Sequence, residues 1–350
     1  MRPSRRAFLL FVPCALLASG CTTLPDVRPF ADSTAALAAA AGTHYHDVAN
    51  DIASLQAPRV PGESAESFET RKQTLEDAQQ IFAETDKNLD ALFAAMTAYS
   101  EKVASLTSAG KTGPDAAQSL LDSLQGFTQL ADVSGVPLGA AATPITRGFK
   151  AIADEFTKVQ ARKSLQEAVA AAQPGVDLVA TQFEVIYGVA MREASNGIRN
   201  TKRLEASIAA GPSIIGFNEN VASNYDAYYR FLNEIVANGD PNAPASVWRG
   251  FCKDATGPCR AVTELDAVGL VEARMDAIHP IVEAYRTEIA VIEGTMERRR
   301  NANKAVIKAV KAWAQEHEKL RRSLEDGTSL SAFNLKAALI ELEGILGHKI

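Results

Sequence analysis

Histidines are the first residues to consider, because a neutral imidazole binds metal ions and transfers protons near pH 7. A di-iron helical bundle needs Glu-x-x-His on two facing helices, and here only His279 has an acidic residue, Asp276, three positions earlier. His44 and His46 are two residues apart and point to different faces of a helix, so we interpret them as a solvated polar patch. His317 falls at an apolar position of a long helical pattern, and we predict that it is packed and hydrogen-bonded.

Motifs of the common catalytic centres are missing from the sequence. It contains no G-x-S-x-G, Walker loop, dinucleotide-binding fingerprint or H-E-x-x-H. Gly42 to Asp47 resembles the G-x-H-x-x-E motif of imelysin-like helical periplasmic proteins, but it has Asp at the last position. We therefore predict no metal and no cofactor and lean against an enzyme, although a periplasmic enzyme stays open as an alternative.

The N-terminus carries an export signal. Residues 2–6 include three arginines, and an apolar stretch, too short to span a bilayer, runs from Ala7 to Leu17. Leu17-Ala18-Ser19-Gly20-Cys21 resembles the bacterial lipobox. The resemblance implies a signal peptide over residues 1–20, lipidation of Cys21 and a lipid-anchored tether over residues 21–31. Thr22, in place of the Asp that retains such lipoproteins at the inner membrane, implies the outer membrane, facing the periplasm.

The export route has two alternatives. Ser4-Arg5-Arg6-Ala7-Phe8-Leu9 resembles the twin-arginine motif that directs folded proteins through the Tat translocon, but Leu10 stands where that motif often has Lys. Paired arginines also occur in Sec signals, so export by Tat or by Sec is expected.

Two cysteines remain in the mature chain besides Cys21. Cys252 and Cys259 bracket six residues of an irregular segment, about 238–259, that is rich in Pro, Gly, Asn and Asp. Nearby cysteines of an exported protein most often pair, so we predict a disulfide between them. The spacing is not that of C-x-x-C and no histidine is near, which disfavours a metal site.

A cluster of arginines, Arg298, Arg299 and Arg300, interrupts an apolar helical pattern. It is either a solvated face with i,i+4 ion pairs or a docking point for an anionic partner, such as an acidic protein or a cell-envelope polymer. Three tyrosines at 225, 228 and 229 span more than one helix face and predict core and rim positions, with an aromatic cleft as the alternative.

Composition predicts a folded, acidic helical protein. The 350 residues are 47% hydrophobic and 22% charged with a formal charge of -6, which argues against disorder and against nucleic-acid binding. Removing residues 1–20 takes away three arginines and no acid, so 33 of the 36 basic residues then face 42 acidic ones. An acidic body should be repelled by anionic headgroups, which leaves the lipid as the expected membrane attachment.

Periodicity predicts helices throughout. A first helix should run from Asp32 or Ser33 to about Gln56. From Glu63 to Ala109 apolar residues alternate by three and four, as in a coiled-coil seam. A second such seam runs from Ile278 to Leu324, with Pro280 as a kink or restart and with Arg299 and Asn303 as polar interruptions.

The helices between and after the two seams are shorter in this interpretation. They cover 115–131, 145 to beyond 169, 176–210, 213–237 and 330–346, with Pro174-Gly175 as a kink or turn and Gly211-Pro212 as a break. We predict an all-α, elongated antiparallel bundle over residues 32–350, in which the two seam helices pack antiparallel to each other. Intrachain packing of the seams is favoured over a homodimeric coiled coil.

Two functions follow from these features. The favoured one is a non-catalytic scaffold or partner-binding lipoprotein, with a protein or cell-envelope polymer as the unknown partner. The alternative rests on a resemblance of architecture to α-helical pore-forming toxins, with the apolar segment Val133–Ile145 as the membrane-inserting tongue. At about thirteen residues that segment is short for a membrane span.

Overall fold

The computed structural model describes residues 24–131, 142–159, 162, 164–217, 264–328, 330 and 333–347, and every regular element among them is a helix. The fold is an all-α helical bundle, as the sequence predicts. Its elements are α1 (Arg28–Ala53), α2 (Ala65–Ser108), α3 (Pro114–Ser123), α4 (Gln125–Thr128), the 3-10 turn η1 (Gln129–Ala131), α5 (Ala142–Thr157), α6 (Leu165–Phe217), α9 (Glu264–Asp326) and α10 (Phe333–Leu346).

Local signals set the ends of the long helices. Ser64 caps α2 by accepting a hydrogen bond from the backbone of Ser67 at 3.2 Å. At the other end Gly110 adopts a φ of 65°, and the backbone of Lys111 donates to the carbonyl of Leu106, which is the Schellman arrangement. Leu165, the first residue of α6, donates to the carbonyl of Thr112, so α2 ends beside the start of α6.

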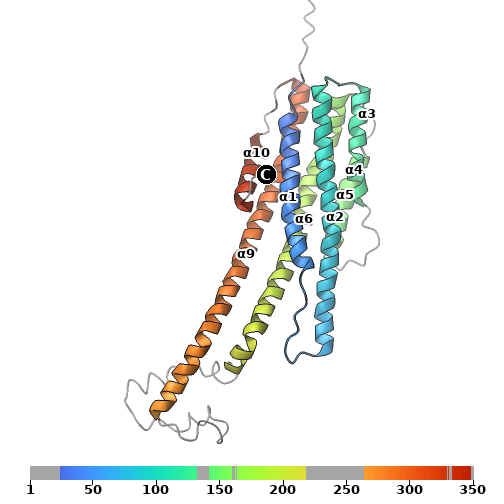
Figure 1. Cartoon of the computed structure of the whole chain (residues 1–350). Helices are drawn as coiled ribbons and strands as arrows, with labels where there is room; N and C mark the ends of the chain where they lie inside the picture. The colour runs from blue at the N-terminus through green and yellow to red at the C-terminus, as the bar shows by residue number, and fades with distance from the viewer. Residues whose placement is uncertain are drawn as a thin grey trace, which may run out of the picture.

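Four helices, α1, α2, α6 and α9, form the body, and each runs opposite to the one before it (Figure 1). Tyr45 on α1 stacks on Phe82 of α2 with ring centroids 4.6 Å apart, and Phe183 stacks on Tyr187 within α6. α10 packs on α9 and α1, and α3 to α5 cover α2 and α6. Fully buried aromatic rings therefore fill the interior of the body.

The two seam helices run parallel to each other, and the predicted antiparallel packing of these two is wrong. At one level of the bundle, Tyr45 and His44 of α1 contact Phe82 of α2 and Asn303 of α9, respectively. At another level, Tyr99 of α2 hydrogen-bonds His317 of α9. Residue numbers in α2 and α9 therefore increase in the same direction along the bundle. The reason is connectivity, since α2 and α9 are the second and fourth helices of an up-down-up-down bundle. Each packs mainly against its antiparallel neighbour, α2 against α1 and α9 against α6.

The N-terminal boundary differs from the expected tether over residues 21–31. Helix α1 begins at Arg28, with Pro29 in its first turn, and Val27 and Phe30 are fully buried. Burial of these two side chains stabilises the extra turn, so residues 27–31 belong to the body.

Two expectations about helix boundaries are also wrong, the unbroken helix from Ile145 to beyond Val169 and the break at Gly211-Pro212. The pattern from Ile145 to beyond Val169 is interrupted, because α5 ends at Thr157 and α6 begins at Leu165. Conversely, α6 continues through Gly211-Pro212. It also continues through Pro174, and α9 continues through Pro280, which excludes the turn and the restart there and leaves the kink alternatives. Packing against neighbouring helices overrides the helix-breaking tendency of these residues, which is only a weak prior.

Candidate partner-binding surface

Two helices extend beyond the body as an arm. Ile52, in the last turn of α1, lies beside Gly197 of α6, and Asp51 pairs with Arg299 of α9. Past the end of α1, α6 and α9 diverge sideways from α2, whose lower end reaches nearly the level of the end of α6 (Figure 1). We call these continuations, residues 199–217 and 264–293, the arm. Arg199 and Arg203 of α6 both contact Glu293 of α9, at 2.8 and 3.4 Å, and link the two arm helices where they leave the body.

A groove of about 590 Å³ lies between the two arm helices. Tyr285 lies in it, with its hydroxyl 3.4 Å from the hydroxyl of Ser207 on the opposite helix. The lining of the groove is mainly apolar and includes three charged residues, of which Lys202 and Glu205 pair at 3.0 Å across one turn. The apolar lining residues are Ala206, Ala209, Ala210, Pro280, Ile281, Ala284 and Tyr285, and the charged ones are Lys202, Glu205 and Glu288.

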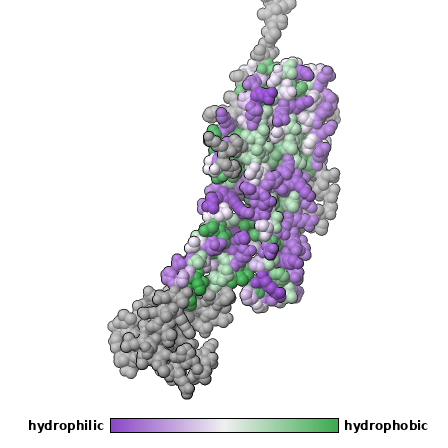
Figure 2. Space-filling model, in the orientation of Figure 1, coloured by the Kyte–Doolittle hydropathy of each residue, from purple (hydrophilic) through white to green (hydrophobic). Residues whose placement is uncertain are grey.

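The arm leaves apolar seam residues partly open to solvent. Ile278, Val282 and Ile289 of the seam are half-buried, and Val291, beside the seam, is 58% exposed. Val306 and Val310 of the same helix are fully buried in the body. Hydrophobic surface among hydrophilic residues is visible on the lower part of the molecule (Figure 2). A grouped apolar surface that also carries charged residues is typical of an interaction site.

The predicted docking cluster of three arginines is divided between two environments. Arg298 and Arg300 are exposed, and Arg298 donates to Thr295 one turn earlier. Arg299 points inward, pairs with Asp51, and has only 15% of its side chain exposed. Burial lowers the pKa of its guanidinium. A single surface of all three is therefore wrong, because consecutive helical residues are rotated by about 100°.

A basic stripe on α9 is not evident as a run of basic residues in the sequence, because its members are three or four positions apart. Exposed Arg300, Lys304, Lys308 and Lys311 follow one another at intervals of four and three. Lys308 pairs with Glu341 of α10 and Lys311 with Glu184 of α6. The charges of Lys308 and Lys311 are thus neutralised by ion pairs with other helices. The end of the stripe near Arg300 is the part that resembles the predicted docking point for an anionic partner.

His44 is buried, and the prediction that it is solvated is wrong. It is 7% exposed, its Nε2 lies 2.9 Å from Oδ1 of Asn303, and burial lowers its pKa. Arg299 and Asn303, the predicted interruptions of the apolar seam of α9, therefore form a polar layer that contacts α1. His46 lies on a different side of α1 and contacts two aspartates of α2.

His317 is packed and hydrogen-bonded, as predicted. Its Nδ1 lies 2.6 Å from Oε1 of Gln173, and its Nε2 lies 2.5 Å from the hydroxyl of Tyr99. The amide nitrogen of Gln173 donates to Asp177, so the Gln173 oxygen accepts from Nδ1 and the Tyr99 hydroxyl donates to Nε2. Burial lowers the pKa of His317 to about 3, so the ring is neutral.

Several predicted sites lie outside the described residues. These are the signal peptide and Cys21, the Cys252–Cys259 pair with its loop, and the three tyrosines 225, 228 and 229. Of the proposed tongue only its C-terminal end is described: Ile145 belongs to α5 and is 5% exposed. Among the described helices, none has an apolar stretch long enough to cross a membrane.

Comparisons with family models, with curated proteins and with solved structures all gave no match. The arrangement of the residues themselves therefore carries the functional argument.

Proposed function

We propose that this protein is an exported, lipid-anchored and non-catalytic scaffold that binds an amphipathic helix of a partner protein in the arm groove. The groove carries the proposal. In the body, α1 packs against both α6 and α9, and the arm groove lies between these same two helices beyond the end of α1. A helix of the partner would continue the packing that α1 makes in the body, with small apolar residues toward the alanines of the lining.

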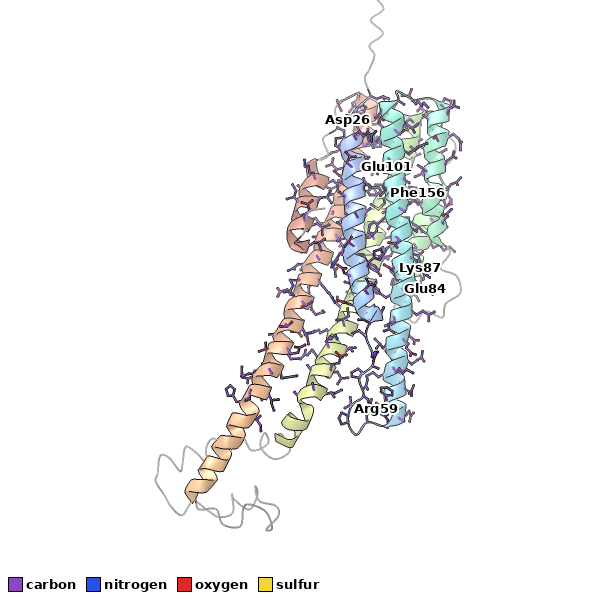
Figure 3. All side chains as sticks on the ribbon, viewed as in Figure 1. Asp26, Arg59, Glu84, Lys87, Glu101 and Phe156 are labelled. Atoms are coloured by element: carbon purple, nitrogen blue, oxygen red, sulfur yellow. The ribbon has the colours of Figure 1, made fainter. Side chains whose placement is uncertain are left out.

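The lipid anchor and the arm lie at opposite ends in this proposal. Asp26, near the start of the described chain, lies at one end of the α1–α2 pair, and Arg59 lies at the other end (Figure 3). Six residues lie between Cys21 and Arg28, and the seven residue steps from one to the other span at most about 25 Å when extended. Lipidation at Cys21 would therefore hold that end of the body close to the membrane, which we take to be the outer membrane, and direct the arm into the periplasm.

Photo-crosslinking in cells tests the groove. A photoreactive residue in place of Ala284 should give an adduct whose crosslinked peptide has apolar residues at helical spacing, and Ala209→Arg should abolish it. The same photoreactive residue at Lys304, on the body, is the matched control and should not give this adduct. Adducts only with lipid, only with a second copy of the chain, or equal adducts at both positions would contradict the proposal.

The anchor is tested separately. Mass spectrometry of the mature N-terminus should find acylated Cys21, and Cys21→Ala should leave the protein unprocessed or released from the membrane. A mature chain that starts elsewhere, without lipid, would refute the anchor while leaving the groove to be judged by crosslinking.

A further inference from the structure

Three potential metal ligands meet on the body, away from the arm. His46 lies on α1, and Asp86 and Asp90 lie one turn apart on α2. Nδ1 of His46 is 3.0 Å from Oδ1 of Asp86, and Nε2 is 3.2 Å from Oδ1 of Asp90. One ligand atom from each residue can be chosen such that all three lie within 4.8 Å of one another.

Two buried oxygen atoms at this cluster lack hydrogen bonds. Oδ1 of Asp86 is closed to solvent, and its approach to His46 does not have the direction of a hydrogen bond. The hydroxyl of Tyr45, the residue before His46, is also buried and makes no well-aligned hydrogen bond, with Thr85 as its nearest polar neighbour, and Tyr45 is only 1% exposed. Buried polar atoms without partners are rare in folded proteins, because each is destabilising. They indicate that a further polar group belongs here.

Each contact of His46 with an aspartate has the length found between two ligands of one metal ion, and one ligand atom from each of the three residues lies within 4.8 Å of the others. For metal–ligand bonds of about 2.1 Å, neighbouring ligands lie roughly 3.0–3.4 Å apart. Only one imidazole nitrogen of His46 can coordinate the ion, so the aspartate that faces the other nitrogen would have to turn its carboxylate toward the ion. An imidazole together with two carboxylates suits Zn²⁺ and similar first-row divalent ions better than Ca²⁺ or Mg²⁺, which prefer oxygen ligands alone.

We propose that His46, Asp86 and Asp90 bind one divalent first-row transition-metal ion, such as Zn²⁺, which joins α1 to α2. His46 and Asp90 are half-exposed, so the ion can enter from solvent and water can complete its coordination. His44 takes no part, because Asn303 on the opposite side of α1 occupies its ring. The site is independent of the groove, and the failure of either proposal would leave the other standing.

Metal binding is measured on the full chain, purified without a histidine tag, by competition with a chromophoric zinc chelator. The wild-type chain should bind one equivalent of Zn²⁺ through this site, and His46→Gln and Asp90→Asn should each weaken that binding at least tenfold. Asp77→Asn on α2 and His279→Gln on α9 are matched controls on exposed residues and should bind as the wild type does. Zn²⁺ should also raise the melting temperature of the wild type and of both controls, but not that of the two site variants.

Co²⁺ is the probe that separates this site from the cysteines. Bound by nitrogen and oxygen, it should give weak visible bands that disappear in His46→Gln, without the strong near-ultraviolet charge-transfer band of a thiolate. Zinc binding that is unchanged in His46→Gln, or no binding by a wild-type chain whose helical circular dichroism is intact, would overturn the proposal. In the latter case His46 is only an ion-pair partner of the two aspartates.

Discussion

The body and the arm share helix α9, and its apolar residues alternate in the same way in both. These residues are buried more completely in the body than in the arm. In the body, Trp313 and Val310 are fully buried because helices surround α9 on several sides. In the arm, Val282 and Ile289 occupy equivalent positions in the pattern but are only half-buried, because α6 is their main neighbour. A heptad pattern thus specifies which face of a helix is apolar, while the number of neighbouring helices sets how much of that face is removed from water.

The largest effect should come from emptying the interior of the body. The fully buried ring of Trp313 stacks on Phe30 with centroids 6.3 Å apart. Trp313→Ala removes this ring and should lower the free energy of unfolding by about 3–5 kcal/mol. Ile289→Ala in the arm should lower it by less than about 2 kcal/mol, because that side chain already contacts water. Urea unfolding of both variants measures the difference. Equal losses would show that the arm is packed as tightly as the body.

Close packing within the body should distinguish two glycines of α6. A Cβ on Gly175 would lie 2.9 Å from ring carbons of Phe156, whose ring is fixed by stacking on Phe127 with centroids 4.1 Å apart. Gly175→Ala should therefore destabilise the protein by about 1–3 kcal/mol. Gly188→Ala is the matched control: a Cβ there meets nothing within 4 Å, so the change should be neutral or stabilise the helix by up to about 1 kcal/mol. Thermal unfolding that ranks the two variants in the opposite order would contradict the packing.

Acid should weaken the body through His317. The pKa of its ring is about 3 in the folded chain and about 6.5 when unfolded, so the unfolded chain binds the extra proton between these values. The contribution of the neutral ring is complete above about pH 6.5 and is lost as the pH falls toward 3. Between pH 7 and pH 5 the wild type should lose about 2 kcal/mol more than His317→Gln, measured by urea unfolding at both values. His279→Gln, an exposed position in the arm, is the control and should show the same pH dependence of stability as the wild type. If His317→Gln also showed the wild-type pH dependence, His317 would be excluded as the cause.

The smallest expected effect is on membranes. The full chain carrying Cys21→Ala should release no dye from vesicles of neutral or anionic lipid, because residues 133–145 are short for a span and the chain is acidic. Ile145→Asp should instead destabilise the body, since Ile145 is buried in α5. Dose-dependent release that disappears in a Leu138→Asp variant of unchanged melting temperature would favour the pore-forming alternative over the scaffold.

Local chemistry made much of the fold predictable. The spacing of apolar residues identifies α2 and the described part of α9, and Ser64 and Gly110 mark the ends of α2 because capping and positive φ depend on single residues. The packed role of His317 follows from its position on the seam. The lipobox and the cysteine pair are likewise properties of neighbouring residues, and they stay predictions.

Tertiary structure alone decided the remaining features. The parallel direction of α2 and α9 depends on how many helices connect them, and the continuation of α6 through Gly211-Pro212 contradicts the local signal. The arm groove is formed by residues of α6 and α9 that are distant in the chain. The meeting of His46 with two aspartates some forty residues away depends on the register between α1 and α2. The sequence determined the apolar face of each long helix through its period, whereas the neighbours of that face depended on contacts between residues far apart in the chain, which no local pattern encodes.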